Sequence, residues 1–275
     1  MRNIIVTGGN RGLGYEIAKT FANQNNHIII ACRDVEHGTY MAKKLPGSSE
    51  VIALDLCSEQ SIYSFTKQLA ERHSKIDVLM NNAGIFDNSG QKVTFMKQSF
   101  SNVWVTNTLG PYLLTKQMTP LLNKSTNPKC VFMSSVVGHH KRLNLKIITE
   151  QPSIEVYSQS KYADLLLTEL FAKEHPSWQV LAAHPGYSNT AIFDGRISGW
   201  KKQVIRQMTN VFGQSPKKGA QSAILAINED FSSGSYIGPK YLKELYGAPR
   251  IQHIQKYYHP EDLAIFSHFL TEIQK

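Results

Sequence analysis

The stretch "NIIVTGGNRGLG", residues 3–14, decides the fold of this 275-residue chain. Its first five residues favour a β-strand, and a glycine-rich loop joins that strand to a helical pattern. Gly8 permits a tight turn, Gly12 lets the backbone approach a pyrophosphate, and Gly14 lets the helix pack closely on the sheet. Because the amino end of a helix favours an anion, the stretch predicts a dinucleotide site rather than a plain glycine turn. The candidate contacts within it are Gly8, Asn10, Arg11, Gly12, Leu13 and Gly14.

Strand-like and helix-like segments alternate along the rest of the chain. This alternation predicts an α/β fold of the Rossmann type, a doubly wound parallel sheet of about seven strands with helices on both faces. Its active site should lie at the carboxyl ends of the strands. We expect a single domain over residues 1–275, with a substrate lid near 187–215 and a C-terminal extension near 239–275. Strands are expected at 3–7, 27–32, 51–54, 77–81, 130–135, 179–184 and 235–238, and helices near 12–24, 35–45, 58–73, 98–123, 156–175 and 216–229.

Composition indicates a globular protein, with 41% hydrophobic and 19% charged residues. The formal charge is +9, but the basic residues are scattered, so we expect a solvated surface and no nucleic-acid partner.

The three cysteines show neither a disulfide framework nor metal-ligand spacing, which favours a reducing compartment and no metal. The longest apolar runs fall short of the roughly 18 residues that span a membrane, and the first strand leaves no room for a signal segment. These features predict a cytoplasmic protein.

The second strand ends in "ACRD", residues 31–34, which bears on the choice of cofactor. An NAD site would normally carry an acidic side chain at this strand end to hold the ribose hydroxyls, whereas Cys32 is small and neutral. Arg33 and Arg11 could together clasp a 2′-phosphate, so the sequence favours NADP. In the alternative, Arg33 is a surface charge and Asp34 binds the ribose, although an Asp before a helix is more often its N-cap.

Two further strand ends carry groups suited to a cofactor. An Asp after the third strand can accept a hydrogen bond from an adenine amino group. "NNAG", residues 81–84, follows the fourth strand and brings small residues and side-chain amides beneath the cofactor. Either motif alone could be a helix cap or a turn. The candidate contacts are Asp55, Leu56, Asn82, Ala83 and Gly84.

The pentapeptide "YSQSK", residues 157–161, places a tyrosine four residues before a lysine in a predicted helix. Residues at this spacing share a helix face, so the Tyr157 phenol and the Lys161 ammonium can point into the same space. Taken alone, the pair is either a surface feature or an acid–base device.

The ordered motifs resemble those of the short-chain dehydrogenase/reductase family. "TGxxxGxG" at the start, "NNAG", "SS" at 134–135, "YxxSK" and "HPG" at 184–186 occur in family order and cover nearly the whole chain. "ACRD", "GHH" at 138–140 and "YIGP" at 236–239 further resemble the retinol-dehydrogenase-like branch and related bacterial reductases. The resemblance implies an oxidoreductase that transfers a hydride between a nicotinamide cofactor and a carbonyl or alcohol.

The resemblance also implies roles for single residues. Tyr157 would exchange a proton with the substrate oxygen, and the Lys161 ammonium with the positive nicotinamide would favour its phenolate. Lys161 would also hydrogen-bond the nicotinamide ribose, and Ser135 the substrate oxygen. Thr190 would contact the carboxamide or a phosphate, with Ser188 close enough to compete. The implied catalytic residues are Asn107, Ser135, Tyr157 and Lys161, and Pro185, Gly186, Ser188 and Thr190 complete the cofactor contacts together with Tyr157 and Lys161.

Pro111 interrupts the helix expected near 98–123. Because proline lacks an N–H and its ring crowds the preceding turn, it should free the backbone oxygen of Asn107 and bend the helix. In the family, an asparagine at this bend holds a water near the catalytic lysine. The freed oxygen could accept from a water that also touches Lys161 and so extend a proton path from Tyr157 to solvent. The alternative is a packing kink without a catalytic part.

The predicted function is NADP-dependent carbonyl reduction or alcohol oxidation, and apolar residues in the expected lid indicate a lipophilic substrate. A catalytically silent dinucleotide sensor or scaffold is the first alternative, although binding alone would not require Ser135, Tyr157 and Lys161. A sugar-nucleotide epimerase is the second, but its glycines are usually spaced GxxGxxG. Tyr157 follows Ser135 by 22 positions, and the segment between them includes an excursion that could shape the substrate pocket. The long helices near 98–123 and 156–175 form dimers in many relatives, so a homodimer is possible.

Overall fold

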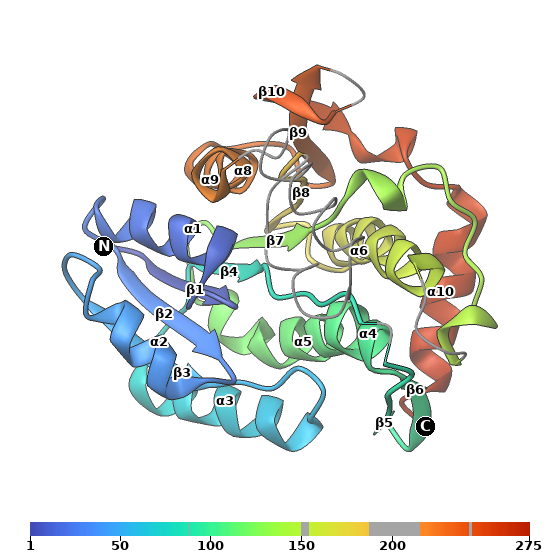
Figure 1. Cartoon of the computed structure of the whole chain (residues 1–275), viewed down its shortest axis with the longest axis horizontal. Helices are drawn as coiled ribbons and strands as arrows, with labels where there is room; N and C mark the ends of the chain where they lie inside the picture. Colours follow the sequence, from blue (N-terminus) through green and yellow to red (C-terminus); the bar gives the residue numbers. More distant parts are fainter. Residues whose placement is uncertain (88, 150–153, 187–214, 242–243) are drawn as a thin grey trace, which may run out of the picture.

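Eight strands form one continuous sheet in the computed structural model, which describes residues 1–87, 89–149, 154–186, 215–241 and 244–275. The strands are β1 (Asn3–Thr7), β2 (His27–Cys32), β3 (Ser49–Ala53), β4 (Val78–Asn81), β7 (Lys129–Met133), β8 (Gln179–Ala183), β9 (Ser235–Tyr241) and β10 (Tyr246–His253). Their order is β10-β9-β8-β7-β4-β1-β2-β3, and only β9 and β10 pair antiparallel (Figure 1). The order reverses between β1 and β4, which places a ligand crevice at the carboxyl ends of these strands.

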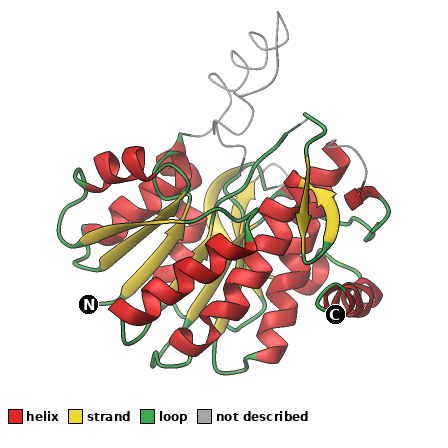
Figure 2. Ribbon diagram, turned by 90° about the horizontal axis from the view of Figure 1, so that it is seen from below, coloured by secondary structure: helices red, strands yellow, loops and turns green. Residues whose placement is uncertain are grey.

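Helices cover both faces of the sheet (Figures 1 and 2). One face carries α1 (Gly12–Ala22), α2 (Val35–Ala42), α8 (Pro216–Gly219) and α9 (Gln221–Asn228). The other carries α3 (Glu59–Arg72), α4 (Asn102–Trp104), α5 (Gly110–Leu122), α6 (Ile154–Glu174) and α10 (Pro260–Glu272). The short turns are the π-helical η1 (Val105–Leu109) and the 3₁₀ turns η2 (Val136–Gly138), η3 (Ile147–Thr149) and η4 (Ile254–Lys256).

Each face of the sheet has its own buried core. Ile4 and Val6 of β1 belong to the cluster that includes α1 and α9, whereas Ile5 between them belongs to the cluster with α3, α5 and α6. Because successive strand residues point to opposite faces, a strand covered on both sides must be apolar throughout. The predicted doubly wound α/β fold is therefore confirmed.

The expected helix over 98–123 is wrong at its beginning. Residues 98–101 form β6 (Gln98–Ser101), which pairs antiparallel with β5 (Lys92–Phe95) in a separate hairpin. The helical segment begins at Asn102, where the Ser101 hydroxyl accepts a hydrogen bond from the N–H of Val103. The helix therefore begins at the serine cap and not at residue 98, although the sequence pattern before the cap also fits a helix.

The sheet also has one strand more than the seven expected. The additional strand, β10, lies in the predicted C-terminal extension, and most of its side chains are exposed. It therefore lacks the buried apolar run that marked the other strands in the sequence.

Pro111 is accommodated by a change of helix type. In η1 the N–H of Gly110 bonds to the oxygen of Val105, five residues back, and Pro111 then lies in the first turn of α5. η1 runs directly into α5, so the missing N–H of Pro111 falls where the i→i+5 bonding of the π-helical turn changes to the α-helical pattern. The expected interruption thus occurs around Asn107, whereas the water path through its backbone oxygen stays a prediction.

The C-terminal residues pack against the helical face that carries α6. Trp104 and Phe266 meet edge to face with ring centroids 6.3 Å apart, and the Tyr162 hydroxyl lies 2.8 Å from Asp262 Oδ2. The excursion after Ser135 joins the same contact, since the N–H of Leu143 donates to Asp262 at 3.0 Å. Within the described ranges, we find no helix with the length and apolar character required to cross a membrane.

Candidate active site

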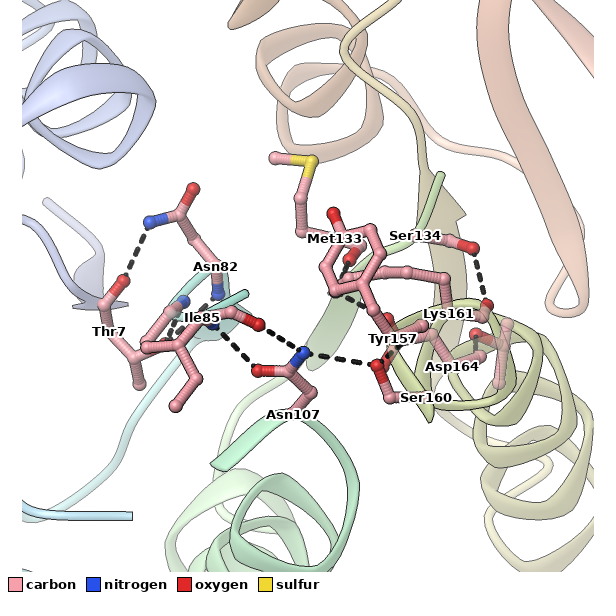
Figure 3. Close-up of polar contacts among 12 residues, drawn as sticks. Thr7, Asn82, Ile85, Asn107, Met133, Ser134, Tyr157, Ser160, Lys161 and Asp164 are labelled. Carbon is pink, nitrogen blue, oxygen red and sulfur yellow. Dashed lines mark hydrogen bonds and ion pairs between the residues drawn. The ribbon is translucent and has the colours of Figure 1, made fainter. Parts of the chain in front are cut away.

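The glycine loop and the residues after β4 form one hydrogen-bonded unit. Thr7 Oγ1 accepts from the N–H groups of Asn82 and Ala83 at 3.0 and 2.9 Å, and Asn82 Nδ2 donates to Thr7 O at 2.8 Å (Figure 3). A Cβ on Gly14 would lie 2.4 Å from Gly8 O and 2.6 Å from Asn82 Nδ2. Only glycine fits at position 14, and Asn82 fixes the shape of the loop.

The outer side of the loop is open. Gly12 has a φ of +56°, and a Cβ there would meet no atom within 4 Å. Gly8 has a φ of +65°, and its Cβ would approach Ala83 Cα to 3.3 Å. The chain therefore offers bare backbone at Gly12, beside the amino end of α1, as a pyrophosphate site requires.

The region after β2 favours the capping role of Asp34 over a ribose role. Its carboxylate accepts from the N–H of His37 at 2.9 Å and caps α2. Arg11 and Arg33 are both exposed, as a 2′-phosphate site requires. The sequence prediction missed His37, whose Nδ1 lies 3.4 Å from Asn10 Nδ2 and which adds a basic side chain to this region.

The residues after β3 form a turn against α5. Asp55 Oδ1 accepts from the N–H of Cys57 at 2.9 Å, so the carboxylate is held close to the end of β3. A Cβ on Gly110 would lie 2.4 Å from Leu56 O. Leu56 therefore positions the backbone of this turn, while its side chain is buried.

Asn107 links the loop after β4 to α6 (Figure 3). Its Oδ1 accepts from the N–H of Ile85 at 2.8 Å, and its Nδ2 donates to Ile85 O at 2.9 Å and to Ser160 Oγ at 3.0 Å. Asn107 is nearly fully buried, and these bonds hold the loop that follows Gly84 at a fixed distance from α6.

The Lys161 ammonium is buried and already paired. Its Nζ donates to Met133 O at 2.8 Å and to Asp164 Oδ2 at 2.9 Å (Figure 3). These bonds use two of its three N–H groups. A Cβ on Gly84 would lie 3.6 Å from Nζ and 3.4 Å from Asn107 Oδ1, so Lys161 reaches the loop where a cofactor would pass.

Burial dominates the acidity of Tyr157, whose ring lies 5.9 Å from Lys161 Nζ. Burial raises the pKa of Tyr157, Lys161 lowers it as expected, and Asp164 raises it again. The net pKa lies above its ordinary value, which corrects the expectation of a favoured phenolate for the protein without cofactor. Tyr157 therefore stays protonated at neutral pH.

Asp164 is the second residue of the candidate site, after His37, that the sequence prediction missed. Burial raises the pKa of its carboxyl to about 6, although Lys161 opposes this rise. Burial alone would lower the pKa of Lys161, but Asp164 outweighs it and the pKa is raised. The i, i+3 spacing from Lys161 was a signal for this pair, since both residues share a helix face.

The remaining predicted residues lie at two neighbouring strand ends. Ser135 lies two residues after the end of β7, at the start of η2, and is half-buried. A Cβ on Gly138 would lie 2.5 Å from the Lys161 carbonyl carbon, so η2 packs tightly on α6. Pro185 and Gly186 follow β8, where Gly186 has a φ of +75°. Ser188, Thr190 and almost all of the expected lid at 187–215 lie outside the described residues.

A family model described as short chain dehydrogenase matches residues 2–199. The chain belongs to the short-chain dehydrogenase/reductase family. It is 30% identical to bovine dehydrogenase/reductase SDR family member 13 over 90% of this chain and 69% of that protein. It is 33% identical to Danio rerio polyprenol dehydrogenase, over 86% of this chain and 76% of that protein. It is 29% identical to mouse retinol dehydrogenase 14, over 86% of this chain and 77% of that protein. The resemblance to the retinol-dehydrogenase-like branch is confirmed, and this family member is an oxidoreductase.

Solved structures agree with this family assignment. A protein from Mycobacterium paratuberculosis superposes with a TM-score of 0.79 and 27% identity, covering 100% of this chain and 93% of that one. The Pseudomonas aeruginosa RhlG complex with NADP superposes with a TM-score of 0.62 and 25% identity, covering 82% of this chain and 89% of that one.

The Lys161–Asp164 pair should influence the pH dependence of catalysis through the pKa of Tyr157. Because the Asp164 carboxylate raises the pKa of Tyr157, Asp164→Asn should lower this pKa and move the pH dependence of kcat/KM for alcohol oxidation to lower pH. Asp164→Glu, which keeps the charge, is the control and should retain the original profile. An unchanged profile in a folded Asp164→Asn protein would show that the pair does not influence the proton transfer.

Proposed function

We propose that this protein is an NADP-dependent oxidoreductase that interconverts a lipophilic carbonyl compound and its alcohol. The observation that carries the proposal is the convergence of Tyr157 and Lys161 of α6 on the Gly84 loop, which Asn107 fixes against the same helix. A buried tyrosine beside a buried ammonium is a costly arrangement that cofactor binding alone would not require.

The residues present fit a dinucleotide. Open backbone at Gly12 suits a pyrophosphate, the exposed Arg33 and Arg11 suit a 2′-phosphate, and the third N–H of Lys161 suits a ribose hydroxyl. The contacts that we propose are Gly8, Asn10, Arg11, Gly12, Leu13, Gly14, Arg33, Asp55, Leu56, Asn82, Ala83, Gly84, Tyr157, Lys161, Pro185 and Gly186, with Ser188 and Thr190 beyond the described residues.

The side chains of this chain divide the acid–base work. When bound, NADPH supplies the hydride. Tyr157, protonated at neutral pH because its pKa is raised by burial, donates its hydroxyl proton to the substrate oxygen as negative charge develops there. Ser135 orients the same oxygen by a hydrogen bond, and the Lys161 ammonium stabilises the phenolate that Tyr157 becomes. In the oxidative direction Tyr157 takes the proton back.

A lipophilic substrate is supported by the site and by the relatives. Phe86 lies edge-on to the Tyr157 ring, with centroids 5.5 Å apart, and adds an apolar wall beside the proton donor. Two relatives are named for polyprenol and retinol, which are both apolar alcohols.

A catalytically silent NADP sensor is the alternative function. It is favoured by one observation, namely that Asp164 already neutralises Lys161 and the pKa of Tyr157 is raised. NADPH consumption against a panel of lipophilic aldehydes and ketones distinguishes the two. Turnover of at least one carbonyl supports the enzyme, whereas tight NADPH binding without any turnover supports the sensor.

Cofactor preference should depend on Arg33. A charge-assisted hydrogen bond to a 2′-phosphate contributes roughly 1.5–3 kcal/mol, so Arg33→Ala should reduce the preference for NADPH over NADH by about tenfold or more. The dissociation constants of both cofactors, measured by fluorescence titration, give the result. Lys43→Ala, at an exposed position after α2, is the matched control and should leave both constants unchanged. Equal constants for the two cofactors in the unaltered protein would disprove the assignment.

Proton donation should depend on the Tyr157 hydroxyl alone. Tyr157→Phe keeps the ring and removes the donor, so we expect kcat to fall by about 10²-fold or more while the NADPH dissociation constant changes little. Lys161→Ala should impair both turnover and cofactor binding. Undiminished reduction by the Tyr157→Phe protein would contradict the role of Tyr157.

A further inference from the structure

Two histidines and a glutamate meet at the edge of the sheet opposite to the active site. His27 begins β2, Glu50 is the second residue of β3, and His73 directly follows α3. These residues lie at the amino ends of the two strands, whereas the cofactor residues follow their carboxyl ends. The cluster is therefore separate from the proposed chemistry.

The three side chains present ligand atoms to one point. Glu50 Oε1 lies 3.2 Å from His27 Nε2 and 2.5 Å from His73 Nε2, and one ligand atom from each residue falls within a span of 4.8 Å. In a tetrahedral zinc site with bonds near 2.0–2.1 Å, neighbouring ligand atoms are about 3.3 Å apart. The His27–Glu50 distance already matches, and His73 Nε2, which lies 2.5 Å from Glu50 Oε1, would have to move away from that oxygen by about 0.8 Å.

A second layer of contacts orients the ligands. His27 Nδ1 lies 2.6 Å from Ser48 Oγ, which leaves its Nε2 directed at Glu50. Metal-binding histidines usually hold their second ring nitrogen in this way. Arg72 NH1 donates to Glu50 Oε2 at 2.9 Å, so the oxygen that faces the imidazoles is the other one, Oε1. The side chains of His27, Glu50 and His73 are only 15, 21 and 13% exposed.

We propose that His27, Glu50 and His73 bind a divalent transition-metal ion, with Zn²⁺ as the best match. Two imidazole nitrogens and one carboxylate oxygen are a ligand set that Zn²⁺ accepts, with water in the fourth position. The ion would cross-link the amino ends of β2 and β3 to the C-terminal end of α3, and its role would be to stabilise the fold. Sequence spacing hides the cluster, because each histidine is 23 residues from Glu50.

The competing interpretation is an ion-pair cluster in which protonated histidines and Arg72 surround Glu50. The two interpretations predict different effects of replacing Arg72 on Zn²⁺ affinity. A guanidinium repels a metal ion, so Arg72→Gln should tighten Zn²⁺ binding if the site binds metal. In an ion-pair cluster the same change would only lower stability, and Zn²⁺ would have no effect.

The experiment is thermal unfolding of the chelator-treated full chain with and without Zn²⁺, together with calorimetric titration. At free Zn²⁺ one hundredfold above its Kd, Tm should rise by roughly 5 °C or more. His27→Asn and His73→Asn should each weaken binding by at least about tenfold, and Arg72→Gln should strengthen it. His268→Ala, an exposed histidine on α10, is the control and should keep the full response.

Two results would overturn the proposal. One is the absence of any Zn²⁺ response in the unaltered chain, and the other is a response that persists when His27 and His73 are both replaced. Circular dichroism before metal addition confirms that each variant is folded. Titration with Co²⁺ gives a second readout, since its absorption spectrum reports tetrahedral nitrogen and oxygen ligands directly.

Discussion

The buried ammonium of Lys161 is the interaction around which the candidate active site is arranged. An ammonium out of water is costly unless partners surround it, and here the Met133 carbonyl and the Asp164 carboxylate do so. The Lys161 carbonyl in turn accepts from Ser134 Oγ at 2.8 Å, which ties α6 to the end of β7. Lys161 therefore joins the end of β7 to the helix that carries Tyr157, and its ammonium lies close to the loop that would face the cofactor.

Asn107 provides the second anchor, because its amide joins the same loop to α6 from the other side. With both anchors in place, Gly84 lies next to Lys161 Nζ and Asn107 Oδ1, which a Cβ at position 84 would meet at ordinary contact distance. The π-helical turn that contains Asn107 supplies the local backbone geometry for this contact. The structure thus relates an irregularity of the helix to the position of the proposed proton donor.

The fold could be predicted from the sequence because β1 and its neighbours are buried on both faces, which imposes continuous apolar runs. β10 and the β5–β6 hairpin lack such runs, because each of these strands pairs antiparallel with the strand next to it in sequence and is largely exposed. For the candidate site, short motifs in the sequence predicted Tyr157, Lys161 and Asn107. Asp164 was missed because its role depends on burial beside Lys161, which spacing along a helix permits but does not require.

The most direct test of the account is a crystal structure of the protein with NADP⁺. We predict that the pyrophosphate lies against the backbone of Gly12, and that Lys161 Nζ keeps Met133 O and Asp164 while its third N–H donates to the nicotinamide ribose. A ribose out of reach of Lys161, or a dinucleotide bound away from the glycine loop, would contradict the account.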